Sequence, residues 1–183
     1  EWLRVVEKLC NSTQWLQQSA LFYGVECLRD TYLDIAIHLA SVEIEDLEVT
    51  YRHTKQWLRG VTDYDKDGNY AWNDGRYAPS SYRYSSQAWP HRHTRNYSGL
   101  LHGEHIVPIH MVTKKWFEMI REGRSKKAQR EFLDLHLEVI WITKDEMKKL
   151  NDAKLSQKMP QNWDWGDNVL SRLNSVDIDV YEG

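Results

Sequence analysis

Apolar residues in the first third of the chain recur at intervals of three and four positions, which is the spacing of amphipathic helices. Residues 1–60 are therefore predicted to form two or three helices, with Gly24 and Gly60 as candidate breaks. The pattern is carried by Trp2, Val5, Val6, Leu9, Leu28, Tyr32, Ile35, Ala36, Leu39, Val42, Leu47, Tyr51, Trp57 and Leu58.

Residues 61–98 have no sustained hydrophobic period. They are rich in Tyr, Ser, Gly, Asp, Asn and Pro, the residue types from which turns and loops are built. The segment predicts a long functional loop, with two short strands as the alternative.

The second half of the chain alternates between strand-like and helical patterns. Residues 100–109 predict an extended segment, and residues 137–143, a run of apolar, β-branched and aromatic side chains, predict the best strand in the chain. Helices are predicted over 112–122, 126–135 and 143–151, the last with Thr143 and Glu146 at the spacing of a capping box. The acidic tail, residues 159–183, is expected to pack its tryptophans back on this unit.

These patterns together predict an α+β fold that is mainly helical. We expect a helical region over 1–60, a loop region over 61–98 and a third region over 99–183, within one compact domain of 183 residues.

The composition narrows the class of protein. Hydrophobic residues at 41% and charged residues at 28% exclude a disordered or fibrous chain. No window approaches the ~18 consecutive apolar residues of a membrane helix, and the first residues are amphipathic, unlike a signal peptide. The two cysteines, Cys10 and Cys27, cannot supply a disulfide framework, so we expect free thiols in a cytoplasmic protein.

Charge is unevenly distributed along the chain. The net charge of −3 argues against a surface that attracts nucleic acid everywhere. Residues 114–130 nevertheless form a basic stretch, against the acids Glu118, Glu122 and, just beyond, Glu131. Its candidate phosphate-binding residues are Lys114, Lys115, Arg121, Arg124, Lys126, Lys127 and Arg130.

A Glu-His pair is the main candidate for chemistry. Glu104 and His105 lie in the extended segment LLHGEHIVP, and the strand and capped helix of VIWITKDEMKKLN follow about thirty residues later. A neutral imidazole can deprotonate a water for attack on a phosphodiester. Neighbouring strand residues point to opposite faces, so both can serve one site only if the backbone bends, as Gly103 and Pro108 would permit.

Over residues 98–160 this arrangement resembles the HNH, or His-Me finger, endonucleases. The resemblance implies a small ββα-metal unit in which His105 is the general base and Glu104 binds Mg²⁺ or Mn²⁺. The family's usual helix ligand falls on Met147, which cannot bind Mg²⁺, so Glu146 or Asn151 would have to replace it. His102 is a further candidate for binding the scissile phosphate.

The same resemblance implies a partner and a role. The substrate would be nucleic acid, DNA more than RNA, and such enzymes serve restriction, phage defence or toxicity. Tyrosines interleaved with arginines in RYAPSSYRY, upstream of the pair, would suit base stacking, and a packed loop explains them equally well.

A second motif supports a different class of function. Residues 63–74 have the spacing of a calcium loop, with an aspartate at its last position and no room for the exiting helix of a paired hand. Its candidate Ca²⁺ ligands are Asp63, Asp65, Asp67, Asn69 and Asp74. The alternative to the nuclease is therefore a non-enzymatic calcium-binding or protein-interaction module, with the N-terminal helices contacting a protein partner or a second copy. A zinc site formed by His91, His93, His102 and His105 is disfavoured, since no cysteine accompanies them.

Overall fold

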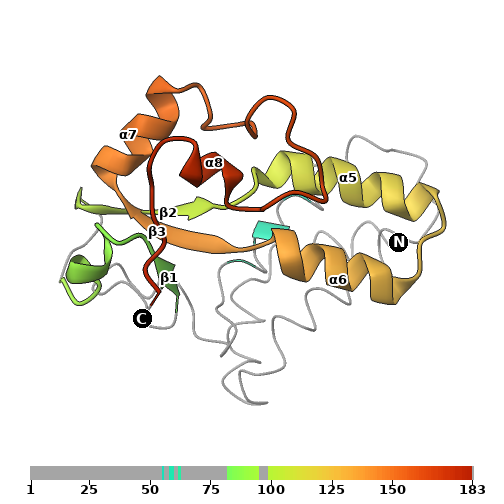
Figure 1. Ribbon diagram of the computed structural model, residues 1–183. Coiled ribbons are helices and arrows are strands. Elements are labelled where there is room, and N and C mark those ends of the chain that lie inside the picture. Colours follow the sequence, from blue (N-terminus) through green and yellow to red (C-terminus); the bar gives the residue numbers. More distant parts are fainter. Residues whose placement is uncertain (1–54, 56–57, 60–61, 63–81, 95–98, 183) are drawn as a thin grey trace, which may run out of the picture.

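The described part of the chain is built around a three-stranded β-sheet with helices packed on it (Figure 1). The structure is a computed structural model, and it describes residues 55, 58, 59, 62, 82–94 and 99–182. Within these residues the fold is mixed α and β, as the sequence predicts. The predicted calcium loop at 63–74 and most of the predicted helices over 1–60 lie outside the described residues.

The sheet has the strand order β1-β3-β2. Its strands are β1 (Arg83–Tyr84), β2 (Leu101–His105) and β3 (Val139–Thr143). β3 is the central strand, parallel to β1 and antiparallel to β2. In the β2–β3 register, Leu101 lies opposite Thr143 and His105 opposite Val139.

The unbroken apolar run of β3 follows from its central position, because both of its faces are buried. Ile140 and Ile142 lie in the main core, while Trp141, between them in the sequence, packs on the other face of the sheet. On that second face Trp141 joins Tyr84 of β1 and Leu101 of β2. The strand predicted over 137–143 is confirmed.

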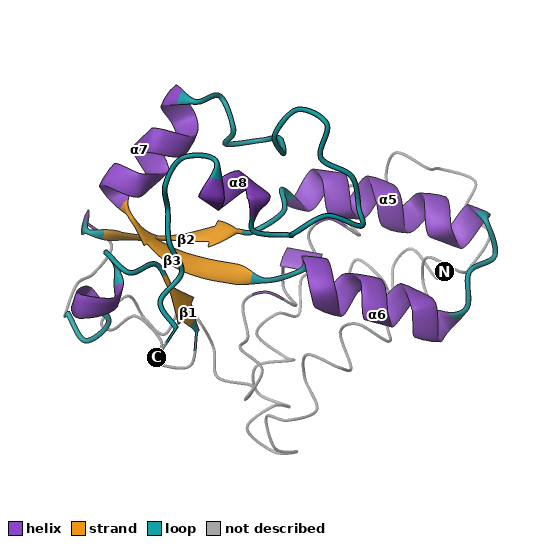
Figure 2. Cartoon of the chain, in the orientation of Figure 1, coloured by secondary structure: helices purple, strands orange, loops and turns teal. Residues whose placement is uncertain are grey.

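Two antiparallel helices, α5 (Ile109–Arg121) and α6 (Lys126–His136), extend from one end of the sheet (Figure 2). Gly123, with φ of 68°, ends α5, because its amide and that of the next residue bond back to the carbonyls of Ile120 and Met119. Trp116 Nε1 of α5 donates to Gln129 Oε1 of α6 at 2.9 Å in the buried seam between the helices. Both helices confirm the predicted ones.

Helix α7 (Lys144–Asp152) follows β3 without a loop. Its N-cap is Thr143, and both halves of the predicted capping box with Glu146 are formed. α7 packs on β2 and β3, and Leu150 on its inner side belongs to the main core. The short helix α8 (Ser171–Asn174) lies over the same face of the sheet (Figure 1).

The C-terminal segment packs on the rest of the unit, as predicted. Trp165 contacts the rings of Phe132 and His136 on α6, at centroid distances of 5.2 Å in both cases. The end of the chain then returns to β1, where Tyr181 stacks on Trp89 of the 3-10 helix η2 (Trp89–His91). β1 itself falls in the region predicted as a loop or as two short strands. None of the described helices has the length and hydropathy needed to cross a membrane.

Candidate functional site

The candidate site lies on β2, whose last two residues are Glu104 and His105. The antiparallel pairing with β3 stays regular through His105, so alternate side chains of β2 point to opposite faces of the sheet. His102 and Glu104 share the face covered by α7 and α8, opposite Ile142 and Ile140 in register. His105 points to the other face, so the bend that would bring Glu104 and His105 together is absent.

Glu104 forms a close cluster with a cation and an imidazole. Its Oε1 accepts from Arg172 Nη2 at 2.7 Å, and its Oε2 lies 3.1 Å from Nε2 of His102. Burial alone would raise the pKa of the Glu104 carboxyl, but the hydrogen bond of His102 and the charge of Arg172 outweigh it and lower that pKa. Glu104 is therefore a carboxylate at neutral pH.

Arg172 is the fully buried cation of this cluster, with no exposed side-chain surface. Helix α8 positions it over β2, where its guanidinium also donates to the carbonyls of His105, Leu155 and Ser156. Lys154, in a left-handed conformation after α7, turns the chain so that the last two of these carbonyls face the guanidinium. The planar fork of an arginine suits such a set of acceptors.

His105 is held in its neutral form. Its Nε2 lies 3.2 Å from the hydroxyl of Thr62, which in turn donates to the carbonyl of Arg59. Burial lowers the pKa of His105 from 6.5 to about 4, because the attraction of Glu104 only partly offsets the lost hydration. Since the Thr62 hydroxyl gives its hydrogen to Arg59, His105 donates to it through Nε2–H, and the lone pair of the neutral imidazole is on Nδ1.

Glu146 is buried, and its carboxylate forms hydrogen bonds that stabilise the fold. Its Oε2 accepts from the backbone amide of Thr143 at 2.7 Å and from Ser85 Oγ at 2.6 Å, and only 1% of the residue is exposed. These bonds link the start of α7 to the segment after β1. Thr143 pairs with Leu101, three residues before Glu104, so Glu146 lies about 10 Å along the strand from that carboxylate.

The predicted metal ligands therefore do not come together. Both oxygens of Glu104 already have partners, Glu146 is committed to the cap, and Asn151 is exposed in the last turn of α7. Across the residues that the structure describes, no three His, Cys, Asp or Glu side chains are grouped as metal ligands would be. The donor set does not fit a shared Mg²⁺ or Mn²⁺.

The other histidines near the site are dispersed. His91 ends η2 and His93 is exposed two residues later. Trp89 of η2 packs on the cluster of Leu101 and Trp141, on the opposite face of the sheet from His102. His102 is the accessible histidine of β2, with 35% of its side chain exposed.

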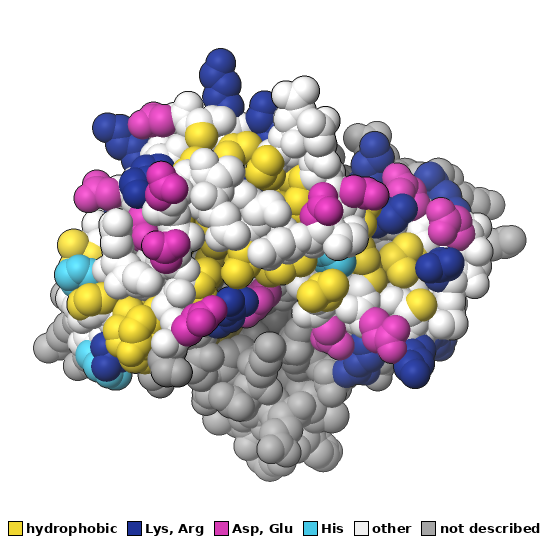
Figure 3. Space-filling model, viewed as in Figure 1, with side chains coloured by type: hydrophobic (Ala, Val, Ile, Leu, Met, Phe, Trp, Pro, Cys, Tyr) yellow, Lys and Arg dark blue, Asp and Glu magenta, His cyan; other side chains and the backbone are white. Residues whose placement is uncertain are grey.

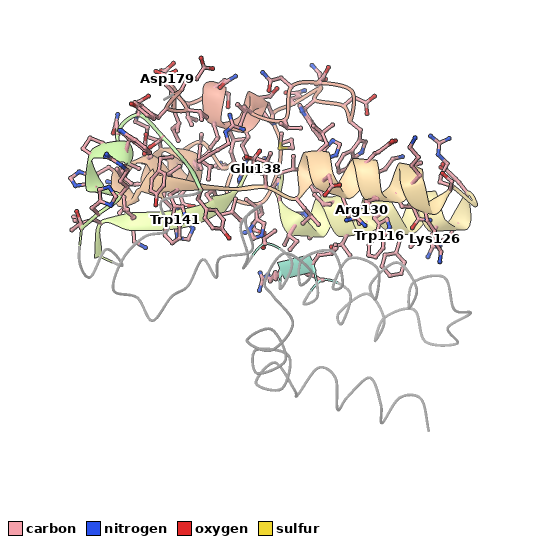
Figure 4. The ribbon with its side chains drawn as sticks, turned by 90° about the horizontal axis from the view of Figure 1, so that it is seen from below. Trp116, Lys126, Arg130, Glu138, Trp141 and Asp179 are labelled. Atoms are coloured by element: carbon pink, nitrogen blue, oxygen red, sulfur yellow. The ribbon has the colours of Figure 1, made fainter. Side chains whose placement is uncertain are left out.

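The basic stretch lies on the α5–α6 hairpin. Several of its side chains are neutralised locally, since Lys115 pairs with Glu118 and Lys127 with Glu131, and Figure 3 shows basic and acidic groups interspersed there. The exposed residues of the stretch that pair with no acid in the described part of the chain are Lys114, Arg121, Arg124 and Lys126. The 13 residues of α5 span about 20 Å, which separates the hairpin tip from β2 (Figure 4).

Comparisons with known proteins add no family assignment. No protein-family model, no curated protein and no solved structure matches the chain.

Arg172 and Ser85 are the residues of this region that sequence reasoning missed. Arg172 follows Ser171 and precedes Leu173 in VLSRL, and a charged residue in this largely apolar segment is the one signal that could have marked it. Ser85 carries no such signal in the Tyr/Ser-rich segment, because its role depends on a contact with a residue 61 positions away.

Proposed function

We propose that the chain hydrolyses phosphodiester bonds in nucleic acid, DNA ahead of RNA, and that the reaction takes place at β2. The observation that carries the proposal is the order of elements around the Glu-His pair. β2 ends on that pair, β3 runs antiparallel beside it, and the capped helix α7 follows β3 directly.

This strand–strand–helix order supports the resemblance to HNH endonucleases, with one elaboration. The α5–α6 hairpin is inserted between the two strands, which accounts for the long interval between the sequence motifs. The position of the family's general base falls on His105, at the last residue of β2.

The chemistry available at β2 supports hydrolysis. The strand carries two imidazoles and a carboxylate, and one imidazole suffices to accept a proton from an attacking water. The family pattern assigns that role to His105, whose imidazole is neutral at physiological pH because its pKa is lowered to about 4.

The unpaired basic residues of the hairpin support a polyanionic substrate. Lys114 lies about 8 Å along α5 from its start, whereas Arg121, Arg124 and Lys126 lie at the hairpin tip. At about 20 Å from β2, the tip residues would contact phosphates some six base pairs from the cleaved bond, taking 3.4 Å per base pair. Contacts of this kind position a duplex without reading its sequence.

The test is cleavage of supercoiled plasmid and of structured RNA, each with Mg²⁺, with Mn²⁺ and with EDTA. The double variant His102→Ala/His105→Ala removes both imidazoles of β2 and leaves the Glu104–Arg172 pair in place. His93→Ala is the matched control, because it removes an exposed histidine that is not part of β2.

We expect wild-type protein and the His93 variant to cut at least one substrate, and the double variant to be inactive. The EDTA arm shows directly whether a metal takes part. Equal cleavage by wild type and the double variant, or no cleavage by wild type, refutes the proposal.

A further inference from the structure

His102 differs from His105 in two ways: its ring contacts the Glu104 carboxylate, and its side chain is exposed to solvent. It lies two residues before Glu104 on the same face of β2, with its Nε2 3.1 Å from Glu104 Oε2. About a third of its side chain is exposed, whereas His105 is turned to the opposite face and contacts Thr62.

The direction of the hydrogen bond follows from the buried arginine. Arg172 is fully buried 2.7 Å from Glu104 Oε1. Burial raises the pKa of the Glu104 carboxyl, but the hydrogen bond of His102 and the charge of Arg172 outweigh it, so Glu104 is ionised. An ionised carboxylate can only accept hydrogen bonds, so His102 donates through Nε2–H. In the neutral imidazole the other nitrogen, Nδ1, then carries a lone pair and is free to take a proton.

We propose that His102, and not His105, is the imidazole that transfers protons in the reaction at β2, with Glu104 and Arg172 as its positioning residues. A carboxylate that orients a histidine through one ring nitrogen leaves the other aimed at the reacting group. The inference rests on the proposed function and changes the residue to which the proton transfer is assigned.

The step balances without a further reactant. His102 Nδ1 takes a proton from water as the water oxygen bonds to phosphorus, and the bond from phosphorus to the leaving oxygen breaks. The leaving oxygen takes a proton from a second water, and His102 returns its proton to the hydroxide so formed. Glu104 retains its hydrogen bond from Nε2–H throughout and stabilises the imidazolium.

The experiment compares single variants on the substrate that wild type cuts. General base catalysis contributes about 10²–10⁴-fold, so His102→Ala should lose that factor in kcat. His102→Gln can still donate to Glu104 but cannot take a proton, and it should lose as much. His93→Ala, at an exposed histidine outside β2, should stay within about threefold of wild type, and His105→Ala should lose less than His102→Ala. Thermal melts check that each variant is folded.

Two further measurements separate a catalytic from a structural role. Imidazole added in solution should restore His102→Ala at least tenfold and have no effect on His102→Gln, in which the space is filled. Glu104→Gln should lower kcat with little change in KM, because it misplaces the base without touching the substrate.

Activity of His102→Ala and His102→Gln equal to wild type, with His105→Ala inactive, overturns this inference and leaves the proposed function intact. A wild type inactive on every substrate overturns the proposed function and the role of His102 with it. Loss in His102→Ala with full activity in His102→Gln also overturns the inference, since it would show that the hydrogen bond to Glu104 is all that His102 supplies.

Discussion

The buried pair of Arg172 and Glu104 gives the sharpest stability prediction. Replacing Arg172 by Met keeps a long apolar side chain and removes the guanidinium. The Glu104 carboxylate, with 15% of its side chain exposed, would keep only its bond to His102. The carbonyls of Leu155 and Ser156 would also lose a donor.

Breaking a buried ion pair by removing one partner costs about 3–5 kcal/mol, because the remaining charge is left uncompensated. We expect Arg172→Met to fall in this range. Arg83→Met is the matched control, since Arg83 pairs with Glu138 at 3.1 Å but with 41% of its side chain exposed. An exposed pair contributes about 0–1 kcal/mol, so this variant should stay close to wild type.

Urea unfolding monitored by tryptophan fluorescence and by circular dichroism measures both variants, and coincident transitions check two-state behaviour. Should Arg172→Met fail to fold, Arg172→Met/Glu104→Gln provides a second measurement. Removing the orphaned charge should recover part of the loss. A loss for Arg172→Met no larger than that for Arg83→Met, or a double variant less stable than the single one, would refute the reasoning.

Three smaller perturbations test other contacts. Because the pKa of His105 is lower in the folded chain (about 4) than in the unfolded chain (6.5), its contribution is fully present above pH 6.5 and is lost as the pH falls toward 4. Between pH 6.5 and 4, the free energy of unfolding of His105→Gln should therefore fall by up to about 3 kcal/mol less than that of wild type, as measured by urea titration. Identical pH profiles of the two proteins would contradict this. Gln129→Ala should cost about 1–3 kcal/mol by leaving Trp116 Nε1 unpaired in the α5–α6 seam, measured by thermal melting, and a neutral result would mean that water replaces the bond. Thr143→Ala should lower the free energy of unfolding by about 0.5–2 kcal/mol through loss of the capping box. The control Asp145→Ala, at an exposed position in the same turn, should lower it by no more than about 0.5 kcal/mol. Equal effects would rule out the cap as the cause.

The local elements of the second half could be predicted from sequence because their signals are local. The run VIWI is buried on both faces and has no polar position to obscure it, and the capping box of Thr143 and Glu146 spans three residues. The predicted start of α5, residue 112, is three residues too late, since Ile109 follows Pro108 in a segment whose apolar residues suit either a strand or a helix.

The candidate site could be predicted only in part. Its position at the end of the first strand was visible in the sequence, but the partners of its side chains were not. Glu104 meets an arginine 68 positions later, and Glu146 meets a serine 61 positions earlier. Such separations leave no periodic trace, so these partners of Glu104 and Glu146 can be identified only from the tertiary contacts.

The central position of β3 determines when the sheet can form during synthesis. β1 and β2 leave the ribosome before β3, and each bonds to β3, which is made 34 or more residues after β2 ends. Until then both strands have unpaired backbone groups, and the exposed edge of each can pair with another chain. Slow translation just after residue 143 would let the three strands assemble before the C-terminal segment arrives, whereas a stall between residues 105 and 139 would prolong the aggregation-prone state.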